Sequence, residues 1–155
     1  MRVAGIDPGI HGGIAIIDSC GQVEEVNLLQ NVVPKTWLLE RKIRLVYIEQ
    51  CQSFPGQGIA SAFNYGREYG YLLGTLAGTG VLTKLVRPGE WTKKIHKIYV
   101  SQGEAKDKSL LVAKHLWPET SFLATARSKK PHDGLIDAAL IAYFGWLNEL
   151  QLNQE

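Results

Sequence analysis

The sequence contains few cysteines, no long apolar run and no internal repeat, and each absence excludes a class of protein. Cys20 and Cys51 follow no disulfide or metal-binding spacing, so we expect reduced, structural thiols. The most apolar stretch, Tyr71 to Leu82, is too short and too rich in glycine to cross a membrane. An apolar run begins almost at once, so we expect no signal or transit peptide. These features favour a cytoplasmic protein without a membrane partner.

Positive charge is also missing from one part of the chain. Residues 131–155 carry 4 Asp/Glu and no Lys/Arg, whereas residues 84–130 carry 11 Lys/Arg against 4 Asp/Glu. Residues 1–83 are nearly balanced, with 6 against 7. The basic segment suggests a polyanionic partner, although a solvated basic face is the simpler explanation when it is taken alone. A length of 155 residues predicts a single domain, residues 1–155, with a substantial core.

The chain is organised around its first residues. An apolar run ends at Asp7, Pro8-Gly9 turns the backbone, and a second apolar run extends to Ile17. Two short apolar runs around a Pro-Gly signal predict adjacent antiparallel strands. Asp7 would then lie at the end of a central strand. A role as a turn residue is an equal alternative at this point.

The remaining pattern alternates between strands and helices. We predict further strands at 22–28, 44–49 and 81–86, and helices at 34–41, 59–78, from 88, 108–117 and 133–150. Loops are expected at 53–58 and 126–131, and a polar, mobile segment at 101–107. This order predicts an α/β fold, with a mixed five-stranded sheet and helices on both faces.

Glycine recurs every fourth residue in the helix predicted over 59–78. Gly66, Gly70, Gly74 and Gly78 would form one stripe. Each glycine inside a helix costs about 1 kcal/mol relative to alanine, so a close backbone approach should compensate. The approaching element would be the sheet, which we favour, or the same helix of a second subunit.

Four carboxylates are positioned to meet. Glu49 ends a strand as Asp7 does, and two parallel neighbouring strands would bring both acids to one sheet edge. Asp133 and Asp137 lie four residues apart on one face of a helix that is otherwise apolar. Asp133 could be a helix cap, but a buried Asp137 needs a cation or a proton. Together the four acids could form an all-oxygen site for two Mg²⁺ ions that promote phosphodiester hydrolysis.

The same residues resemble a known family. The segments Gly5-Ile-Asp-Pro-Gly9, Tyr47-Ile-Glu49, Phe54-Pro-Gly-Gln-Gly58 and His132-Asp-Gly-Leu-Ile-Asp-Ala-Ala-Leu140 resemble RuvC-type Holliday-junction resolvases, and most of all their compact phage and chloroplast branch. The likeness extends from Met1 to about Phe144. It implies a ribonuclease H-like fold, a homodimer, and Mg²⁺-dependent paired nicks in four-way DNA junctions, with Mn²⁺ as a substitute metal. It also implies a location at the nucleoid, or in the host cytoplasm for a phage protein.

The resemblance assigns catalytic and metal-binding roles to Asp7, Glu49, Asp133 and Asp137. In some members the last pair is three residues apart, or its first residue is His. His132 is therefore a further candidate beside Asp133. We favour Asp133, because a spacing of four keeps it on the Asp137 face, whereas a spacing of five would turn His132 away.

The basic segment then has a role in DNA binding. Contacts to DNA are expected from Phe54, Gln57, Lys84, Arg87, Lys93, Lys94, Lys106, Lys108, Arg127, Lys129 and Lys130. Phe54, Phe63 and Tyr65 follow Glu49, where resolvases present aromatic side chains to bases. Phe54 is the best stacking candidate, whereas we expect Phe63 to pack in the core.

Other residues and other functions receive simpler interpretations. His11, His96 and His115 are expected at the surface or in packing, and Trp37, Trp91, Trp117 and Trp146 mostly in the core. A different nuclease with the same fold, acting on flaps or RNA–DNA hybrids, would share the four acids. A non-catalytic junction-binding protein would lack one of them. A sugar-kinase-like ATPase would need a second lobe, for which the chain is too short.

Overall fold

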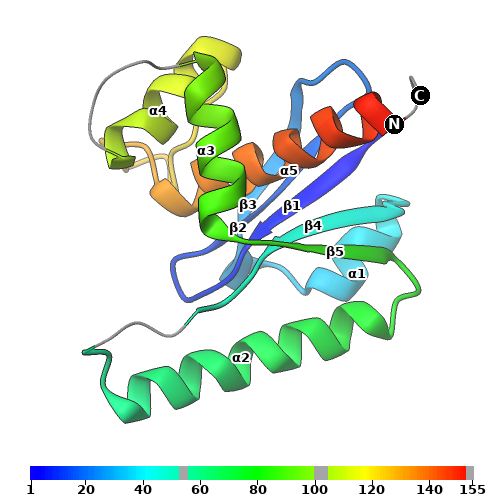
Figure 1. Cartoon of the computed structure of the whole chain (residues 1–155), viewed down its shortest axis with the longest axis vertical. Coiled ribbons are helices and arrows are strands. Elements are labelled where there is room, and N and C mark those ends of the chain that lie inside the picture. The colour runs from blue at the N-terminus through cyan, green and yellow to red at the C-terminus, as the bar shows by residue number, and fades with distance from the viewer. Residues whose placement is uncertain (53–55, 100–104, 153–155) are drawn as a thin grey trace.

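The computed structural model describes residues 1–52, 56–99 and 105–152, and the side chains of 105–107 are not described. Its centre is one five-stranded sheet with the strand order β3-β2-β1-β4-β5 (Figure 1). β1 (Val3–Asp7) and β2 (Gly13–Ile17) form the antiparallel hairpin that the Pro-Gly turn predicts. β3 (Val23–Leu28) pairs with β2 as the half-buried edge strand. The predicted mixed sheet, with Asp7 at the end of its central strand, is confirmed.

The other two strands are parallel to β1. β4 (Leu45–Glu49) pairs with β1, and β5 (Leu82–Val86) pairs with β4. Because these three strands run in the same direction, their carboxyl ends meet at one edge of the sheet. Asp7 and Glu49 both end their strands there, as expected.

Helices cover both faces of the sheet. On one face, α3 (Pro88–Tyr99), α4 (Ala105–Leu116) and α5 (Asp133–Leu152) enclose the larger apolar core. On the other face lie the short 3-10 helix η1 (Leu29–Asn31), α1 (Pro34–Glu40) and α2 (Ile59–Ala77), around a second core (Figure 1). No helix of the described ranges is long and apolar enough to cross a bilayer.

Glycines let α5 lie directly on the hairpin. A Cβ atom at Gly5 of β1 would be 2.2 Å from the carbonyl oxygen of Ala138. One at Gly134 of α5 would be 2.0 Å from the carbonyl oxygen of His11. Farther along α5, a Cβ atom at Gly145 would overlap the Tyr47 ring, with its nearest atom at 2.3 Å. At Gly5 and Gly134, α5 therefore touches the hairpin backbone to backbone, at a distance that no side chain at these two positions would allow.

The glycine stripe of α2 makes no such approach. Cβ atoms at Gly66, Gly70 and Gly74 would meet nothing within 4 Å, and all three glycines are exposed. The favoured prediction that this stripe packs on the sheet is therefore wrong. Leu72 and Leu76 instead seat the helix, and they lie in its C-terminal half. The stripe faces outward, where the structure of one chain leaves room for a neighbour.

Three further expectations concern residues outside the sheet. Phe63 is 69% exposed, so the prediction that it packs in the core is wrong. The polar segment expected to end at residue 107 is shorter, because α4 begins at Ala105; residues 100–104 lie outside the described ranges. The tryptophan prediction is confirmed, since Trp37, Trp91 and Trp117 are at most 5% exposed and Trp146 is partly buried.

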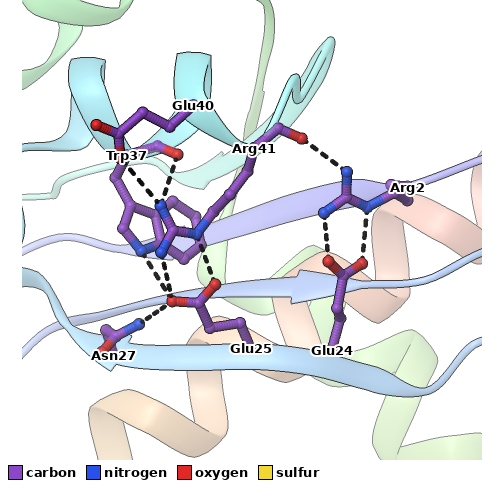
Figure 2. A network of polar contacts seen from close by, with 7 residues as sticks. All are labelled: Arg2, Glu24, Glu25, Asn27, Trp37, Glu40 and Arg41. Carbon is purple, nitrogen blue, oxygen red and sulfur yellow. Dashed lines mark hydrogen bonds and ion pairs between the residues drawn. The ribbon is translucent and has the colours of Figure 1, made fainter.

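A polar network fastens the edge strand β3 to α1 (Figure 2). The Arg41 side chain donates to both carboxylate oxygens of Glu25, at 2.5 and 2.8 Å, and its guanidinium lies 4.5 Å from the centre of the Trp37 ring. The Trp37 indole and the Asn27 amide donate to the same carboxylate. These donors, above all Arg41, hold the pKa of Glu25 below its usual value.

Candidate active site

Two acids meet at the carboxyl edge of the sheet because their strands are neighbours. Ile6 of β1 pairs with Ile48 of β4, so the following residues, Asp7 and Glu49, leave the sheet side by side. α5 crosses β1 at Gly5 and brings its first two turns, with Asp133 and Asp137, over this edge. The pairing of β1 with β4 and the crossing of α5 over β1 thus bring the elements that carry the four acids to one edge of the sheet.

A cavity of about 590 Å³ opens where the hairpin turn meets α5. Asp7, Asp133 and Asp137 all line it. The rest of its wall consists of Pro8, Gly9, His11, Gly12, Pro131, His132 and Gly134. Three of the four predicted acids thus share one cavity, and Glu49, which does not line it, ends the strand next to that of Asp7.

Burial and mutual repulsion favour the protonated forms of these acids. Burial, followed by the charges of Asp137 and Glu49, raises the pKa of Asp7 to about 8. Burial, with the charges of Glu49 and Asp133, raises the pKa of Asp137 to about 7, although a hydrogen bond from Ser109 opposes the increase. Burial also raises the pKa of Glu49. A bound cation would stabilise the ionised forms of these carboxyl groups and so lower their pKa values.

Two buried polar atoms at the cavity have no hydrogen-bond partner among the described residues: Oδ1 of Asp137 and Nδ1 of His132. Buried acceptors without a partner are rare, and a ligand or ion commonly explains them. Carboxylate oxygens are the donors that Mg²⁺ and Mn²⁺ prefer, so the residue types fit a divalent cation. In the described part of the chain, no three His, Cys, Asp or Glu side chains are already close enough to hold one ion together.

Glu49 is held by a residue that the sequence did not associate with the site. The indole Nε1–H of Trp91 donates to Oε2 of Glu49 at 2.6 Å, and Trp91 is only 2% exposed. Trp91 was expected in the core, where it indeed packs, but 42 residues separate it from Glu49. A single indole in a basic stretch carries no periodic signal that would reveal this contact.

Asp137 has a comparable support from α4. Ser109 hydrogen-bonds its carboxyl, and Nε2 of His96 lies 3.2 Å from the Ser109 hydroxyl oxygen. A hydroxyl that donates to Asp137 can accept from His96, which needs the tautomer with hydrogen on Nε2. Burial, with the charge of Lys108, lowers the pKa of His96 and favours its neutral form. The expected packing role of His96 is thus a hydrogen-bonded one.

The structure changes the comparison between His132 and Asp133. α5 begins at Asp133, so His132 precedes the helix, and its carbonyl accepts from the backbone N–H groups of Leu135 and Ile136. The spacing rule that would turn His132 away does not apply outside the helix, so the preference for Asp133 as the metal-binding residue loses that argument and stays a prediction. His132 and Asp133 line the same cavity, and His11 also faces it, 6.5 Å from the His132 ring.

The predicted DNA-binding cations fall into separate groups. Lys129 and Lys130 are exposed in the loop that leads into His132, and Lys108 on α4 precedes Ser109. Lys93 and Lys94 line a second cavity of about 500 Å³ between α3 and α5. Lys94 donates to Asn148 and Gln151 near the C-terminal end of α5, roughly 16 Å along the helix from Asp137. The structure therefore places this pair away from the acids.

The other candidates differ in how they are engaged. Lys84 pairs with Glu149 and lies 5.7 Å from the centre of the Tyr47 ring, so it takes part in packing between β5 and α5. Arg87 is exposed after β5, and Gln57 is half-buried before α2. The Tyr65 hydroxyl lies 3.5 Å from the carbonyl oxygen of Pro8, so Tyr65 supports the hairpin turn. Phe54 and the Lys106 side chain lie outside the described residues.

Comparison with known proteins shows the fold. No family model matches the sequence, and no curated protein matches it. A solved structure of T. thermophilus RuvC in complex with a Holliday junction substrate superposes with a TM-score of 0.64 at 18% identity, covering 97% of this chain and 96% of that chain. Thermus thermophilus RuvC alone gives 0.61 at 19%, with 97% of each chain covered. The predicted ribonuclease H-like fold of the RuvC type is therefore confirmed.

Proposed function

We propose that this RuvC-fold protein is a divalent-metal-dependent endodeoxyribonuclease that resolves four-way DNA junctions by paired, symmetric nicks. The observation that carries the proposal is the group of repelling acids at the carboxyl edge of β1 and β4, with α5 above them. A carboxylate with a purely structural role does not need other acids beside it, whereas hydrolysis of a phosphodiester by two metal ions requires several acids close together to bind the ions. The solved RuvC structure with a Holliday junction substrate makes junction DNA the first substrate to test.

In this proposal the ions are held by Asp7, Glu49 and Asp137, with Asp133 or His132 as the fourth ligand. Divalent ions bound there would activate water and neutralise the leaving oxygen of the phosphodiester. The protein's own contribution is to hold the acids at the sheet edge in one arrangement and to leave the cavity open to the DNA backbone. Lys108, Lys129 and Lys130 would hold phosphates beside the cavity.

A synthetic four-way junction tests the proposal directly. Each strand is labelled in turn, incubated with protein and Mg²⁺, and mapped for cleavage. We expect nicks at symmetry-related positions in two opposing strands, and none in a duplex of the same sequence. A flap and an RNA–DNA hybrid serve as matched substrates. Preferential cutting of either would support another nuclease of this fold, and junction binding without cutting would support a non-catalytic binder.

Salt dependence would show which cations touch DNA. We expect that replacing Lys129 and Lys130 together by Gln flattens the plot of log affinity against log salt by roughly one to two units, because each phosphate contact releases about one counterion. The measurement is junction affinity, without cleavage, over a range of salt concentrations. The control is the double variant Lys42→Asn and Arg44→Gln, which removes two exposed cations at the opposite end of β4. Equal slopes in the two variants would place the loop lysines away from DNA.

A second copy of the chain is part of the proposal, because symmetric nicks need two sites. The outward side of α2 supplies a surface, which we call the glycine face: Ile59, Phe63, Gly66, Gly70 and Gly74. These positions follow helical spacing, Ile59 is 90% exposed and Phe63 is 69% exposed. The unfilled space beside the glycines would admit a second helix at short range.

Gly70→Leu tests the glycine face. A Cβ atom at Gly70 would meet nothing within 4 Å, and leucine favours a helix by about 1 kcal/mol over glycine, so monomer stability should be unchanged or higher. Overpacking against a second helix should weaken the dimer by roughly tenfold or more. Sedimentation equilibrium and melting curves measure the two effects. Ser61→Leu, exposed on α2 but off the glycine face, is the control. A wild-type monomer that still cuts junctions symmetrically would refute the dimer.

A further inference from the structure

One contact links the site to a helix outside the cavity wall. Trp91 lies in the first turns of α3, which begins immediately after β5 and Arg87. β5 pairs with β4 through Glu49 and Val86, so α3 starts at the same sheet edge as the acids. The Trp91 indole N–H reaches Oε2 of Glu49 at 2.6 Å. The indole cannot move far, because it is 2% exposed and its ring lies 6.2 Å from the His96 ring, edge to face.

We propose that Trp91 is a positioning residue for Glu49: its indole N–H holds Oε2 and leaves Oε1 as the oxygen offered to a metal ion. This inference rests on the proposed function of the site. Indole nitrogen is a donor only, so the bond has one direction and fixes which carboxylate oxygen is engaged. Donors in the outer shell of a metal site commonly set the orientation of the ligand in this way.

The chemistry of the donor distinguishes this role from simple pairing. A lysine or arginine at this position would neutralise Glu49 and compete with the cation. The indole is neutral, so it orients the carboxylate and leaves its negative charge for the ion.

A second tryptophan shows that burial alone does not require a carboxylate. The Trp117 indole is equally buried, at 2%, and donates to the backbone carbonyl of Gly21 at 2.9 Å. That bond satisfies the indole and involves no residue of the site. Trp117 is therefore a matched control, with the same residue type, burial and donor but a different acceptor.

The first experiment observes the hydrogen bond without metal and without cleavage. In a ¹⁵N-labelled protein, the Trp91 indole N–H signal should move when Glu49→Gln replaces the charged acceptor by a neutral one. The Trp117 signal should not move. The signals can be assigned from Trp37→Phe, Trp117→Phe and Trp146→Phe even if Trp91→Phe fails to fold. A Trp91 signal that is unaffected by Glu49→Gln would overturn the proposal.

The second experiment measures binding of Mn²⁺ alone to the full chain by titration calorimetry. Loss of an outer-shell partner commonly costs 10- to 100-fold in metal affinity, so we expect about tenfold weaker binding for Trp91→Phe and no change for Trp117→Phe. Glu49→Gln separates two claims: that Glu49 binds the metal ion, and that Trp91 positions Glu49. If Glu49→Gln weakens binding and Trp91→Phe does not, the metal site stands and the positioning role is overturned. If Glu49→Gln binds Mn²⁺ as the wild type does, Glu49 is not a metal ligand. The proposed function then loses one of its ligands, and the positioning role of Trp91 is overturned.

Discussion

Asp7→Asn is expected to abolish junction cleavage while leaving junction binding unchanged. The variant keeps the shape of the side chain but removes the charge that would hold a divalent ion at the end of β1. Loss of about 4 kcal/mol of transition-state stabilisation corresponds to a rate lower by roughly 10³-fold. Glu49→Gln and Asp137→Asn should have effects of the same order. Binding should persist, because it depends on lysine and arginine contacts with phosphates.

The measurements are single-turnover cleavage of a labelled four-way junction and its affinity in the absence of metal. Asp18→Asn is a suitable control, because Asp18 is a carboxylate outside the site that accepts backbone N–H bonds from Cys20 and Gln22 in the β2–β3 turn. That variant should cut at nearly the wild-type rate. Near-wild-type cleavage by any of the three site variants would remove that residue from the catalytic group.

A second large effect concerns stability: without metal, Asp137→Asn should melt at a higher temperature than the wild type at neutral pH. Crowded carboxylates repel each other by about 1 kcal/mol per close pair even with water-like screening, and by more when partly buried. Asparagine keeps the shape and removes the charge. For a domain of this size, each kcal/mol corresponds to a few degrees in Tm.

The pH dependence has a definite sign. The pKa of Asp7 is raised to about 8 and that of Asp137 to about 7, whereas an aspartate in an unfolded chain has a pKa of about 3.9. Between these limits the folded protein binds more protons than the unfolded one, so the free energy of unfolding falls as pH rises from about 4 to about 8. The metal-free wild type should therefore melt higher at pH 5 than at pH 8, and Asp137→Asn should show a weaker dependence.

Mg²⁺ should reverse the order of the two proteins by binding only the folded site. It should stabilise the wild type by an amount that grows with the logarithm of its concentration, and stabilise Asp137→Asn much less. Melting curves at pH 5, 7 and 8, with and without Mg²⁺, contain the whole test. A metal-free Asp137→Asn that melts below the wild type, together with equal Mg²⁺ shifts, would show that these acids do not surround a metal.

Local patterns predicted the elements well and the contacts between them unevenly. The Pro8-Gly9 turn and the strand-ending acids Asp7 and Glu49 followed from short-range rules, and the parallel pairing of β1 with β4 brought the two acids together. The Trp91–Glu49 hydrogen bond joins residues on different elements and depends on a side-chain orientation. No spacing rule encodes such an orientation, so only the assembled fold shows it.

The prediction that the glycine stripe of α2 packs on the sheet is wrong for a physical reason. A four-residue repeat identifies one face of a helix but not what lies against that face. The repeat predicts a close backbone approach of α2 to the sheet, yet α2 packs there through Leu72 and Leu76, and the close backbone approach belongs to α5, through Gly134 and the strand residue Gly5. His132 illustrates the same limit at a helix end, because one residue outside the first turn no longer obeys helical spacing.

The seating of α5 on β1 also determines how the site tolerates change elsewhere. Asp133 and Asp137 belong to one helix, and Asp7 and Glu49 to two paired strands, so the four acids form two rigid halves. A methyl group at Gly5 would need α5 to lift by about 1.2 Å to bring the 2.2 Å contact with Ala138 to an ordinary 3.4 Å. Both acids of the helix would move with it, away from both acids of the strands. A substitution in the apolar interior should thus disturb the candidate site, and under the proposed function a side chain added at Gly5 or Gly134 should cost metal affinity as well as stability.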